Sequence, residues 1–178
     1  VGPGTRFLQY ASLSFDASLA EIITALTYGA CLVMITQEVV YSPEALQELM
    51  QRQHVTTAIL PPSVLEYLNP DDLPELRNLG SAGEKCPVEL AAKWVKGRYF
   101  YNAYGPTEAT VGPTIYRVPE DIAVRANVPI GRPIRNMYVY ILDREQQLLP
   151  PGIPGEICIG GVGISLGYLN RPELTAVG

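Results

Sequence analysis

The sequence predicts an α/β protein: a doubly wound, mostly parallel sheet with helices on both faces, followed by an antiparallel β hairpin. Two observations carry this prediction. Up to residue 118, short apolar runs typical of strands alternate with segments of helical periodicity, and the connections between them are short. After residue 127, the strand-like segments 137–143 and 155–161 are separated only by a polar, Pro- and Gly-rich link, which is typical of antiparallel pairing.

Two segments carry the clearest helix signals. In residues 16–29 the apolar positions recur at i, i+3, i+4 and i+7, the stripe of an amphipathic helix: Leu19, Ile22, Ile23 and Leu26. Gly29 suits the end of this helix. Residues 42–53 begin with Ser42, a good N-cap residue, and Pro43 then occupies the first helical position.

The remaining elements of the first part follow from composition. Runs rich in branched and aromatic residues predict strands at 6–12, 31–35, 55–60, 75–83 and 98–104. Two further helices are expected at 63–68 and 87–95, the second with Trp94 in the core. Ligands of such sheets bind beyond the carboxyl ends of the strands. We therefore expect a site where three loops open on one edge: 14–18, 81–85 and 104–108.

The stretch YNAYGPTEAT, which contains the last of these loops, concentrates groups suited to a nucleotide. Tyr104 offers a flat face for a nucleobase, and Asn102 has the paired donor and acceptor that an adenine edge needs. The turn at Gly105 allows close backbone approach, Thr107 can donate to a phosphate oxygen, and Glu108 can hold Mg²⁺. The structural alternative is a turn in which the threonine caps a helix and the tyrosine is buried.

Asp16 also has two interpretations. It precedes the helix at 16–29, so an N-cap is the simpler one. The alternative is a carboxylate that binds a cation, such as an ammonium group, at the mouth of the sheet.

Composition argues against several classes of function. Thirteen basic and eighteen acidic residues give a net charge of −5, without a basic cluster for nucleic acid or an anionic membrane. No apolar run has the length of a membrane span, and the start does not resemble a signal peptide. The three cysteines are widely separated in sequence: Cys31, Cys86 and Cys158. Their odd number and spacing argue against a disulfide framework or a zinc site, so we expect a protein of the reducing cytoplasm.

Two other features are expected to be structural. His54 has no acidic neighbour in sequence, so we expect it to be solvated or to interact with a helix end. The segment GGVGISLG (160–167) has a G-x-G-x-x-x-G spacing and lies among hairpin segments, so a dinucleotide-binding loop is not expected.

Three segments together resemble a known family. LSFDASLAEI (13–22), YNAYGPTEAT (101–110) and GEICIGGVGISLGYLNRPELTA (155–176) are similar, in order and spacing, to successive core motifs of the adenylation domains of nonribosomal peptide synthetases. The resemblance runs the whole length of the chain and points to the AMP-forming, adenylate-producing superfamily. It implies a flavodoxin-like subdomain over residues 1–126 and a partial β-barrel subdomain over residues 127–178.

The resemblance implies a reaction. An amino acid and ATP would give an aminoacyl-adenylate and pyrophosphate, and the phosphopantetheine arm of a thiolation (carrier) domain would then take the aminoacyl group. The residues that would line or hold the nucleotide and Mg²⁺ are Ala82, Gly83, Glu84, Asn102, Tyr104, Gly105, Thr107 and Glu108. Among them, Thr107 would meet the α-phosphate and Glu108 would serve Mg²⁺, which makes both candidate catalytic residues.

The resemblance also implies an amino-acid pocket. Its lining would be Asp16, Ala17, Ala20, Ile59, Gly80, Ala82, Ala103, Val111 and Gly112. Asp16 would pair with the α-ammonium group, for which acyl-CoA ligases have no use. The other residues are uncharged and mostly small, so we expect a bulky apolar or aromatic substrate.

Some features of the family are not found in the sequence. We expect its phosphate loop to lie before residue 1, and its ribose-binding aspartate and its C-terminal subdomain with the catalytic lysine to lie after residue 178. We therefore expect the chain to be part of a larger protein and to be inactive alone in ATP–pyrophosphate exchange. Two alternatives stay open: a non-catalytic amino-acid-binding or scaffold module of the same fold, and a flavodoxin-type flavin binder. The acidic SFDAS loop would repel the phosphate of a flavin.

Overall fold

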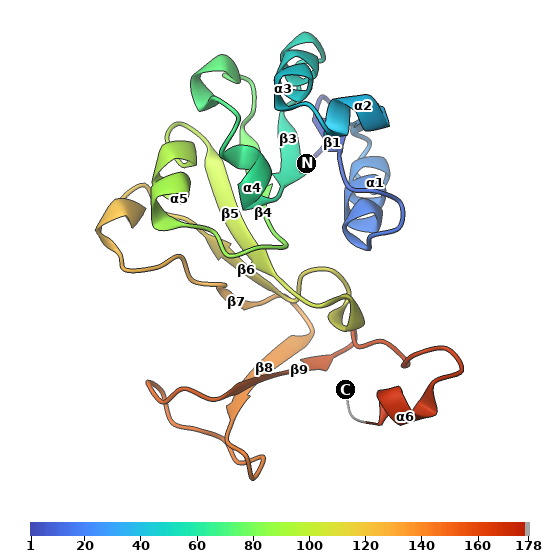
Figure 1. Ribbon diagram of the computed structural model, residues 1–178, viewed down its shortest axis with the longest axis vertical. Coiled ribbons are helices and arrows are strands. Elements are labelled where there is room, and N and C mark those ends of the chain that lie inside the picture. The colour runs from blue at the N-terminus through green and yellow to red at the C-terminus, as the bar shows by residue number, and fades with distance from the viewer. Residues whose placement is uncertain (177–178) are drawn as a thin grey trace.

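A seven-stranded sheet forms the centre of the structure, a computed structural model that describes residues 1–176 (Figure 1). The strand order is β2-β1-β3-β4-β5-β6-β7. The strands are β1 (Arg6–Gln9), β2 (Cys31–Met34), β3 (Thr57–Leu60), β4 (Asn78–Ser81), β5 (Tyr99–Tyr104), β6 (Thr114–Arg117) and β7 (Arg132–Pro133). Strands β1 to β5 are parallel in the order β2-β1-β3-β4-β5, which is the flavodoxin-like order. The predicted fold class is confirmed.

The sequence did not reveal where antiparallel pairing begins. β6 pairs antiparallel with β5, from Tyr101↔Arg117 to Tyr104↔Thr114, and β7 pairs antiparallel with β6. The change of direction therefore occurs before residue 127, and the sheet extends past residue 126. The division of the chain into subdomains at that point stays a prediction.

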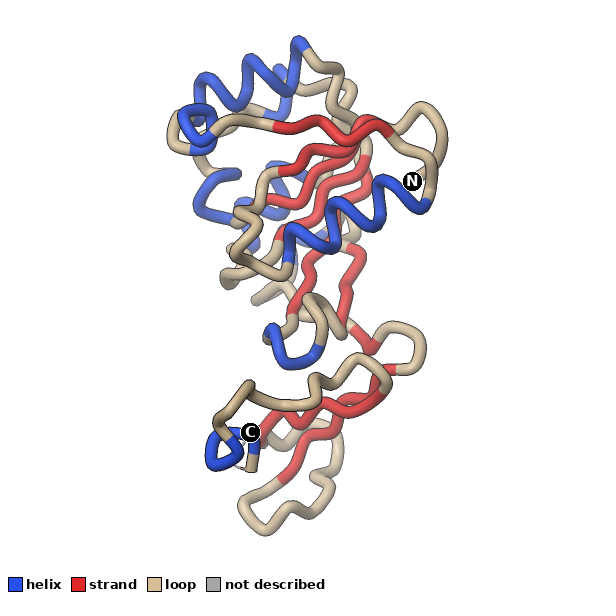
Figure 2. The backbone as a smooth tube through the Cα atoms, turned by 90° about the vertical axis from the view of Figure 1, so that its right-hand side faces the viewer, coloured by secondary structure: helices blue, strands red, loops and turns tan. Residues whose placement is uncertain are grey.

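A separate hairpin follows the sheet (Figures 1 and 2). β8 (Met137–Leu142) and β9 (Glu156–Gly161) pair antiparallel over their whole length, as the sequence predicts. The chain then passes through a loop to the short helix α6 (Pro172–Thr175).

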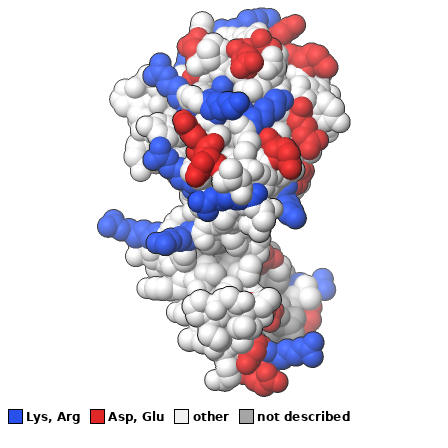
Figure 3. Space-filling model, turned by 90° about the vertical axis from the view of Figure 1, so that its left-hand side faces the viewer, with Lys and Arg blue, Asp and Glu red and all other residues white. Residues whose placement is uncertain are grey.

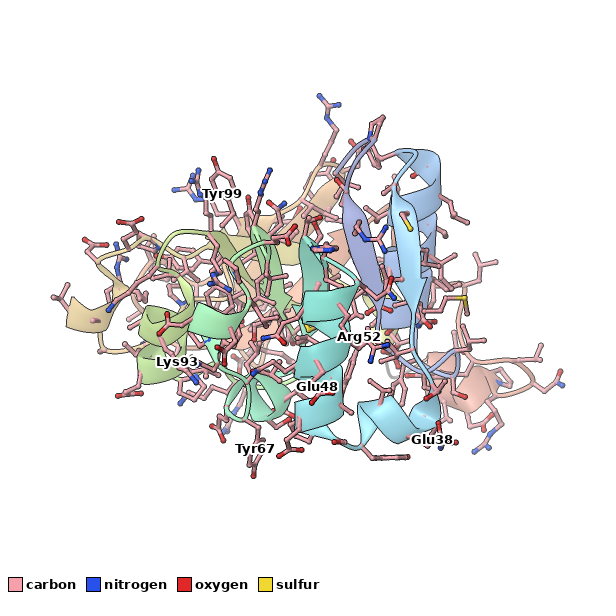
Figure 4. The ribbon with its side chains drawn as sticks, turned by 90° about the horizontal axis from the view of Figure 1, so that it is seen from above. Glu38, Glu48, Arg52, Tyr67, Lys93 and Tyr99 are labelled. Carbon is pink, nitrogen blue, oxygen red and sulfur yellow. The ribbon has the colours of Figure 1, made fainter. Side chains whose placement is uncertain are left out.

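The main core lies between the sheet and helices α3 (Pro43–Arg52), α4 (Pro62–Leu65) and α5 (Val88–Trp94). Leu8, Leu79 and Phe100 of the sheet are buried here, and Trp94 packs against them as expected. The start of α3 is stabilised by a side-chain cap. Ser42 Oγ accepts a hydrogen bond from the Ala45 N–H at 3.2 Å, which confirms the predicted N-cap. The charged side chains on α3 and α5 point outward in Figure 4, which labels Glu48, Arg52 and Lys93.

The shorter elements complete the fold. They are α2 (Gln37–Val40) and the 3₁₀ turns η1 (Pro70–Asp72), η2 (Thr107–Ala109) and η3 (Ile122–Val124). No helix in the described range 1–176 has the length and apolar character needed to cross a bilayer.

Helix α1 (Ala17–Thr27) lies on the opposite face of the sheet, where Figure 2 shows it crossing in front of the strands. An amphipathic stripe normally faces the core, but here Leu19, Ile23 and Leu26 are each more than half exposed. The buried positions are instead Ser18, Glu21 and Ala25. The apolar stripe therefore faces outward, because the sheet below α1 accepts a small-residue face that carries one carboxylate.

Candidate functional site

The three loops expected to form a site do open on one edge of the sheet. β1, β4 and β5 run parallel, so the loops that follow them leave the sheet at the same end. This placement follows from chain direction alone, and it brings segments that are more than 60 residues apart in sequence to one edge of the fold.

A half-open cavity of about 370 Å³ lies at this edge. It is lined by Gly83, Glu84, Lys85, Cys86, Asn102, Ala103, Tyr104, Gly105, Val128 and Ile130. Five residues predicted to contact a nucleotide are thus brought together, and Ala82 directly precedes them at the end of β4. Tyr104 is 39% exposed, so the alternative of a buried tyrosine is wrong.

Sequence reasoning missed part of this lining. Val128 and Ile130 come from the segment that we interpreted only as a boundary, and Cys86 follows the predicted turn. Burial raises the pKa of the Cys86 thiol, so this sulfur stays protonated and apolar in character near neutral pH. These residues give the cavity an apolar wall, and no local motif signals that.

Two predicted polar residues of the cavity are already engaged. The Asn102 side-chain amide is buried and donates to the Pro129 carbonyl oxygen at 2.9 Å, which ties β5 to the wall that contains Val128 and Ile130. The Glu84 carboxylate accepts hydrogen bonds from the Ser63 N–H at 3.0 Å and the Ser63 hydroxyl at 2.8 Å. Both side chains therefore shape the cavity in this structure, and a direct role toward a nucleotide stays a prediction for each.

Asp16 occupies the N-cap position of α1, but its side chain makes no capping hydrogen bond. Its Oδ2 atom is buried and has no hydrogen-bond partner among the described residues. Buried carboxylate oxygens are normally paired, since an unpaired one costs free energy. Asp16 is therefore the N-cap residue of α1 by position, but its side chain does not cap the helix, and the role of this carboxylate toward a ligand stays a prediction.

The residues predicted to set substrate specificity share one face of the sheet. Ile59 lies in register with Gly80 on the neighbouring strand, and Gly80 lies in register with Tyr101, two residues before Ala103 on the same face. A Cβ added at Gly80 would lie 3.3 Å from Ile59 Cγ1, so a larger residue would crowd this surface. The face is the one covered by α1, whose first turns supply Ala17 and Ala20.

The face assignment rests on Glu21, a residue that sequence reasoning missed. Glu21 on α1 is completely buried, and its carboxylate accepts hydrogen bonds from the N–H groups of Tyr10 and Ala11 and from the Gln9 side chain. Gln9 alternates with Leu8, which belongs to the main core, so α1 lies on the other face. The available signal was a single acidic residue in an otherwise uncharged helix.

The turn that carries Thr107 and Glu108 is tightly constrained. Both residues are exposed on η2. Thr110 and Val111 follow with φ of +56° and +68°, a region that β-branched residues rarely adopt and that marks strain at functional sites. A Cβ on Gly105 would lie 2.1 Å from Pro113 Cδ, so the chain fits here only with glycine. Val111 and Gly112 thus connect the turn η2 to β6.

The geometry is that of a sheet-edge cavity beside a strained turn, and comparison with known proteins shows the family to which the chain belongs. The sequence profile of the family described as AMP-binding enzyme matches residues 1–169. The chain belongs to this family. The chain is similar in sequence to bacitracin synthase 3 of Bacillus licheniformis, with 47% identity over 97% of the chain. It is also similar to tyrocidine synthase 1 of Brevibacillus parabrevis, with 41% identity over 96% of the chain.

Solved structures agree. PA1221, a nonribosomal peptide synthetase protein with adenylation and PCP domains, matches 99% of the chain at 31% identity and a TM-score of 0.90. The Vibrio cholerae adenylation domain AlmE, solved with glycyl-adenosine-5′-phosphate, matches the whole chain at 30% identity and a TM-score of 0.89. The predicted resemblance to adenylation domains of AMP-forming ligases is therefore confirmed.

The chain spans only a part of these proteins. It covers 3% of bacitracin synthase 3, 16% of tyrocidine synthase 1, 32% of the PA1221 chain and 36% of the AlmE chain. The roles of individual site residues stay predictions.

Proposed function

We propose that this chain forms the amino-acid pocket and part of the nucleotide site of an adenylation domain that converts an amino acid and ATP into an aminoacyl-adenylate and pyrophosphate. The observation that carries the proposal is the buried, unpartnered Oδ2 of Asp16. A substrate α-ammonium group would satisfy this oxygen and neutralise its charge, since buried charges are stable when they are paired.

The substrate is proposed to be a bulky apolar or aromatic amino acid. Ala17, Ala20, Gly80 and Ala103 have small side chains or none, and Ile59 would supply an apolar wall, which favours a large apolar substrate side chain. Apart from Asp16, the proposed lining contains no charged group that could pair with an acidic or basic side chain.

For the nucleotide, we propose that Tyr104 stacks on adenine in the cavity and that Ala82, Gly83, Glu84, Asn102 and Gly105 line it. Thr107 would contact the α-phosphate. Glu108 fits a Mg²⁺ ligand because it presents an exposed carboxylate on a rigid turn, and Mg²⁺ prefers oxygen ligands. When bound, Mg²⁺ would neutralise charge on the phosphates.

The later partner is proposed to be a carrier domain. PA1221 contains adenylation and PCP domains, and its holo form was solved with a vinylsulfonamide inhibitor. By analogy, the aminoacyl group would pass from the adenylate to a carrier-bound phosphopantetheine thiol. We further propose that the 178 residues alone do not catalyse exchange, because they contain no Pro-Lys-Gly phosphate loop.

The test is ATP–pyrophosphate exchange in an intact adenylation domain that carries this sequence, with a panel of amino acids. We expect the highest kcat/KM with apolar or aromatic amino acids. Asp16→Ala should lower kcat/KM for the preferred amino acid by about 10²–10⁴-fold, since an unpaired buried charge costs about 3–5 kcal/mol. The preference for the amino acid over its analogue without the amine should shrink in this variant.

Asp121→Ala is the matched control, because Asp121 is exposed and makes no capping hydrogen bond at η3. Highest activity with Lys, Arg, Asp or Glu would refute the proposed substrate class. An equal loss for the amino acid and its des-amino analogue would refute the role of Asp16. Amino-acid binding without any exchange would favour a non-catalytic binding module.

A further inference from the structure

The turn that carries Glu108 is fastened to a loop that lies far away in sequence. We define residues 162–168, which follow β9, as the support loop. The Tyr168 hydroxyl donates a hydrogen bond to Glu108 Oε1, and the Ser165 N–H donates to the Glu108 carbonyl oxygen at 2.7 Å. One residue of the proposed nucleotide site is therefore held through both its side chain and its main chain by the support loop.

A second contact holds the strained end of the same turn. The Thr110 hydroxyl donates to the Gly163 carbonyl oxygen at 2.6 Å, next to the pair Thr110–Val111 with positive φ. Gly163 fits closely, because a Cβ there would lie 3.0 Å from Met137 Sδ and 3.5 Å from the Ala109 carbonyl oxygen. Figures 1 and 2 show η2 directly beside the chain that leaves β9. The hairpin unit and the sheet edge thus meet at this turn.

Tyr168 is itself held in place from behind. Its N–H donates to Thr175 Oγ1 at 2.9 Å, and its carbonyl oxygen accepts from the Arg171 N–H at 3.1 Å. At Gly167, which has φ of +124°, a Cβ would lie 2.4 Å from Thr175 Cγ2. Helix α6 therefore fixes the backbone from which the tyrosine reaches Glu108.

This arrangement suits the control of a metal ligand. A hydroxyl that donates to a carboxylate fixes the orientation of that group, and such charge-assisted bonds are among the stronger ones in proteins. A carboxylate has about four lone-pair sites, so one bond from Tyr168 leaves acceptor capacity for a cation. Partners that orient metal ligands typically change metal affinity or activity by about 10–100-fold when they are removed.

We propose that Tyr168 is a positioning residue that orients the Glu108 carboxylate for Mg²⁺, and that the support loop is part of the nucleotide site. The inference rests on the proposed role of Glu108. It gives a function to the segment GGVGISLG, which we interpreted from the sequence as structural, and to Tyr168, which follows it.

The test uses Tyr168→Phe, which removes only the hydroxyl, in an intact adenylation domain that carries this sequence. In ATP–pyrophosphate exchange, the Mg²⁺ concentration for half-maximal rate should rise about 10–100-fold, whereas the KM for the amino acid should stay within about twofold of the unsubstituted enzyme. Independently of activity, Mn²⁺ binding in the presence of a non-hydrolysable ATP analogue, measured by electron paramagnetic resonance, should weaken by a similar factor.

Tyr138→Phe is the matched control, because Tyr138 is an exposed tyrosine of the same hairpin unit. Glu108→Gln tests the metal role of Glu108 separately from the positioning role of Tyr168. If Glu108→Gln leaves Mg²⁺ dependence and Mn²⁺ binding unchanged, the metal role of Glu108 is wrong and the inference falls with it. If Glu108→Gln weakens both and Tyr168→Phe behaves like Tyr138→Phe, only the inference is overturned.

The double variant provides a further check. Groups that act through one another are not additive, so Tyr168→Phe in the Glu108→Gln background should cause little additional loss of Mn²⁺ affinity. An equal additional loss in both backgrounds, or a parallel rise of the amino-acid KM, would show that Tyr168 acts on the structure in general and would overturn the proposal.

Discussion

Glu21 shows how one side chain can fix the entrance to a binding site. Its carboxylate binds the backbone N–H groups of Tyr10 and Ala11, where β1 ends and the loop toward Asp16 begins. Burial raises the pKa of Glu21 to about 7, and the hydrogen bonds from Ala11, Tyr10 and Gln9 oppose this rise. The folded protein therefore binds a proton here that the unfolded chain releases at lower pH.

This shift predicts a pH dependence of stability. A carboxyl group whose pKa is raised on folding stabilises the protein below its unfolded pKa, and this contribution is lost as pH rises through the folded value. Between pH 4.5 and about 7, Glu21 should therefore lower the free energy of unfolding by about 3 kcal/mol. Urea unfolding at pH 5 and pH 8 measures the effect.

Glu21→Gln should remove this pH-dependent part, because the amide does not titrate. Glu48→Gln is the control, since Glu48 is exposed on α3 (Figure 4). If the unsubstituted chain and Glu21→Gln lost equal stability between the two pH values, the carboxyl would not titrate as the burial requires.

At the scale of single elements, α3 and α1 illustrate two different ways to stabilise a helix. α3 begins with a side-chain cap from Ser42 and buries Leu46 and Met50, which lie four residues apart on one face. α1 lacks a side-chain cap and directs its apolar stripe outward. Local signals therefore account for α3, whereas α1 depends on its contacts with β1.

The cap of α3 leads to a stability prediction. Ser42→Ala should lower the free energy of unfolding by about 1 kcal/mol, because the Ala45 N–H loses its acceptor, and Ser42→Gly should cost less. Urea denaturation measures both. Thr36→Ala is the matched control, since Thr36 is the N-cap residue of α2 without a capping hydrogen bond. Equal losses at Ser42 and Thr36 would contradict the proposed cap.

Charged and exposed apolar side chains are distributed unevenly over the surface of the molecule. Figure 3 shows side chains of both charges spread over the upper part of the side opposite α1. On α1 itself, Leu19, Ile23 and Leu26 are exposed together at helical spacing. Neighbouring exposed apolar side chains of this kind favour association.

We expect the 178-residue chain to self-associate through α1 at high concentration. Replacing Leu19, Ile23 and Leu26 by Gln, Lys and Gln should lower the apparent mass in sedimentation experiments, because less apolar surface would then be buried on association. Tyr67→Ser is the control, since Tyr67 is an isolated exposed aromatic residue on the α4 side (Figure 4). Unchanged association of the triple variant would exclude α1 as the contact surface.

Much of the site could be predicted because its parts are local. The segment from Asn102 to Glu108 contains the end of a strand, a turn and a set of polar groups within a few residues. Parallel strands bring the loops that follow them to one edge of the sheet. What could not be predicted are the partners that each group finds. Asn102 bonds to Pro129, Glu84 to Ser63 and His54 to Glu75, pairs separated by at least 21 residues.

The sequence by itself determined the type of the main helices, of β1 to β5 and of the β8–β9 hairpin, the parallel sheet, and the family, but not β6, β7 or the short helices α2 and α6. Periodicity, caps and turn residues act over a few positions, so they can be interpreted without a structure. The tertiary structure decided which face of α1 turns inward, that Asp16 caps nothing, and that Tyr168 reaches Glu108 across 60 residues. These outcomes depend on hydrogen bonds between distant segments, whose free energy no local pattern encodes.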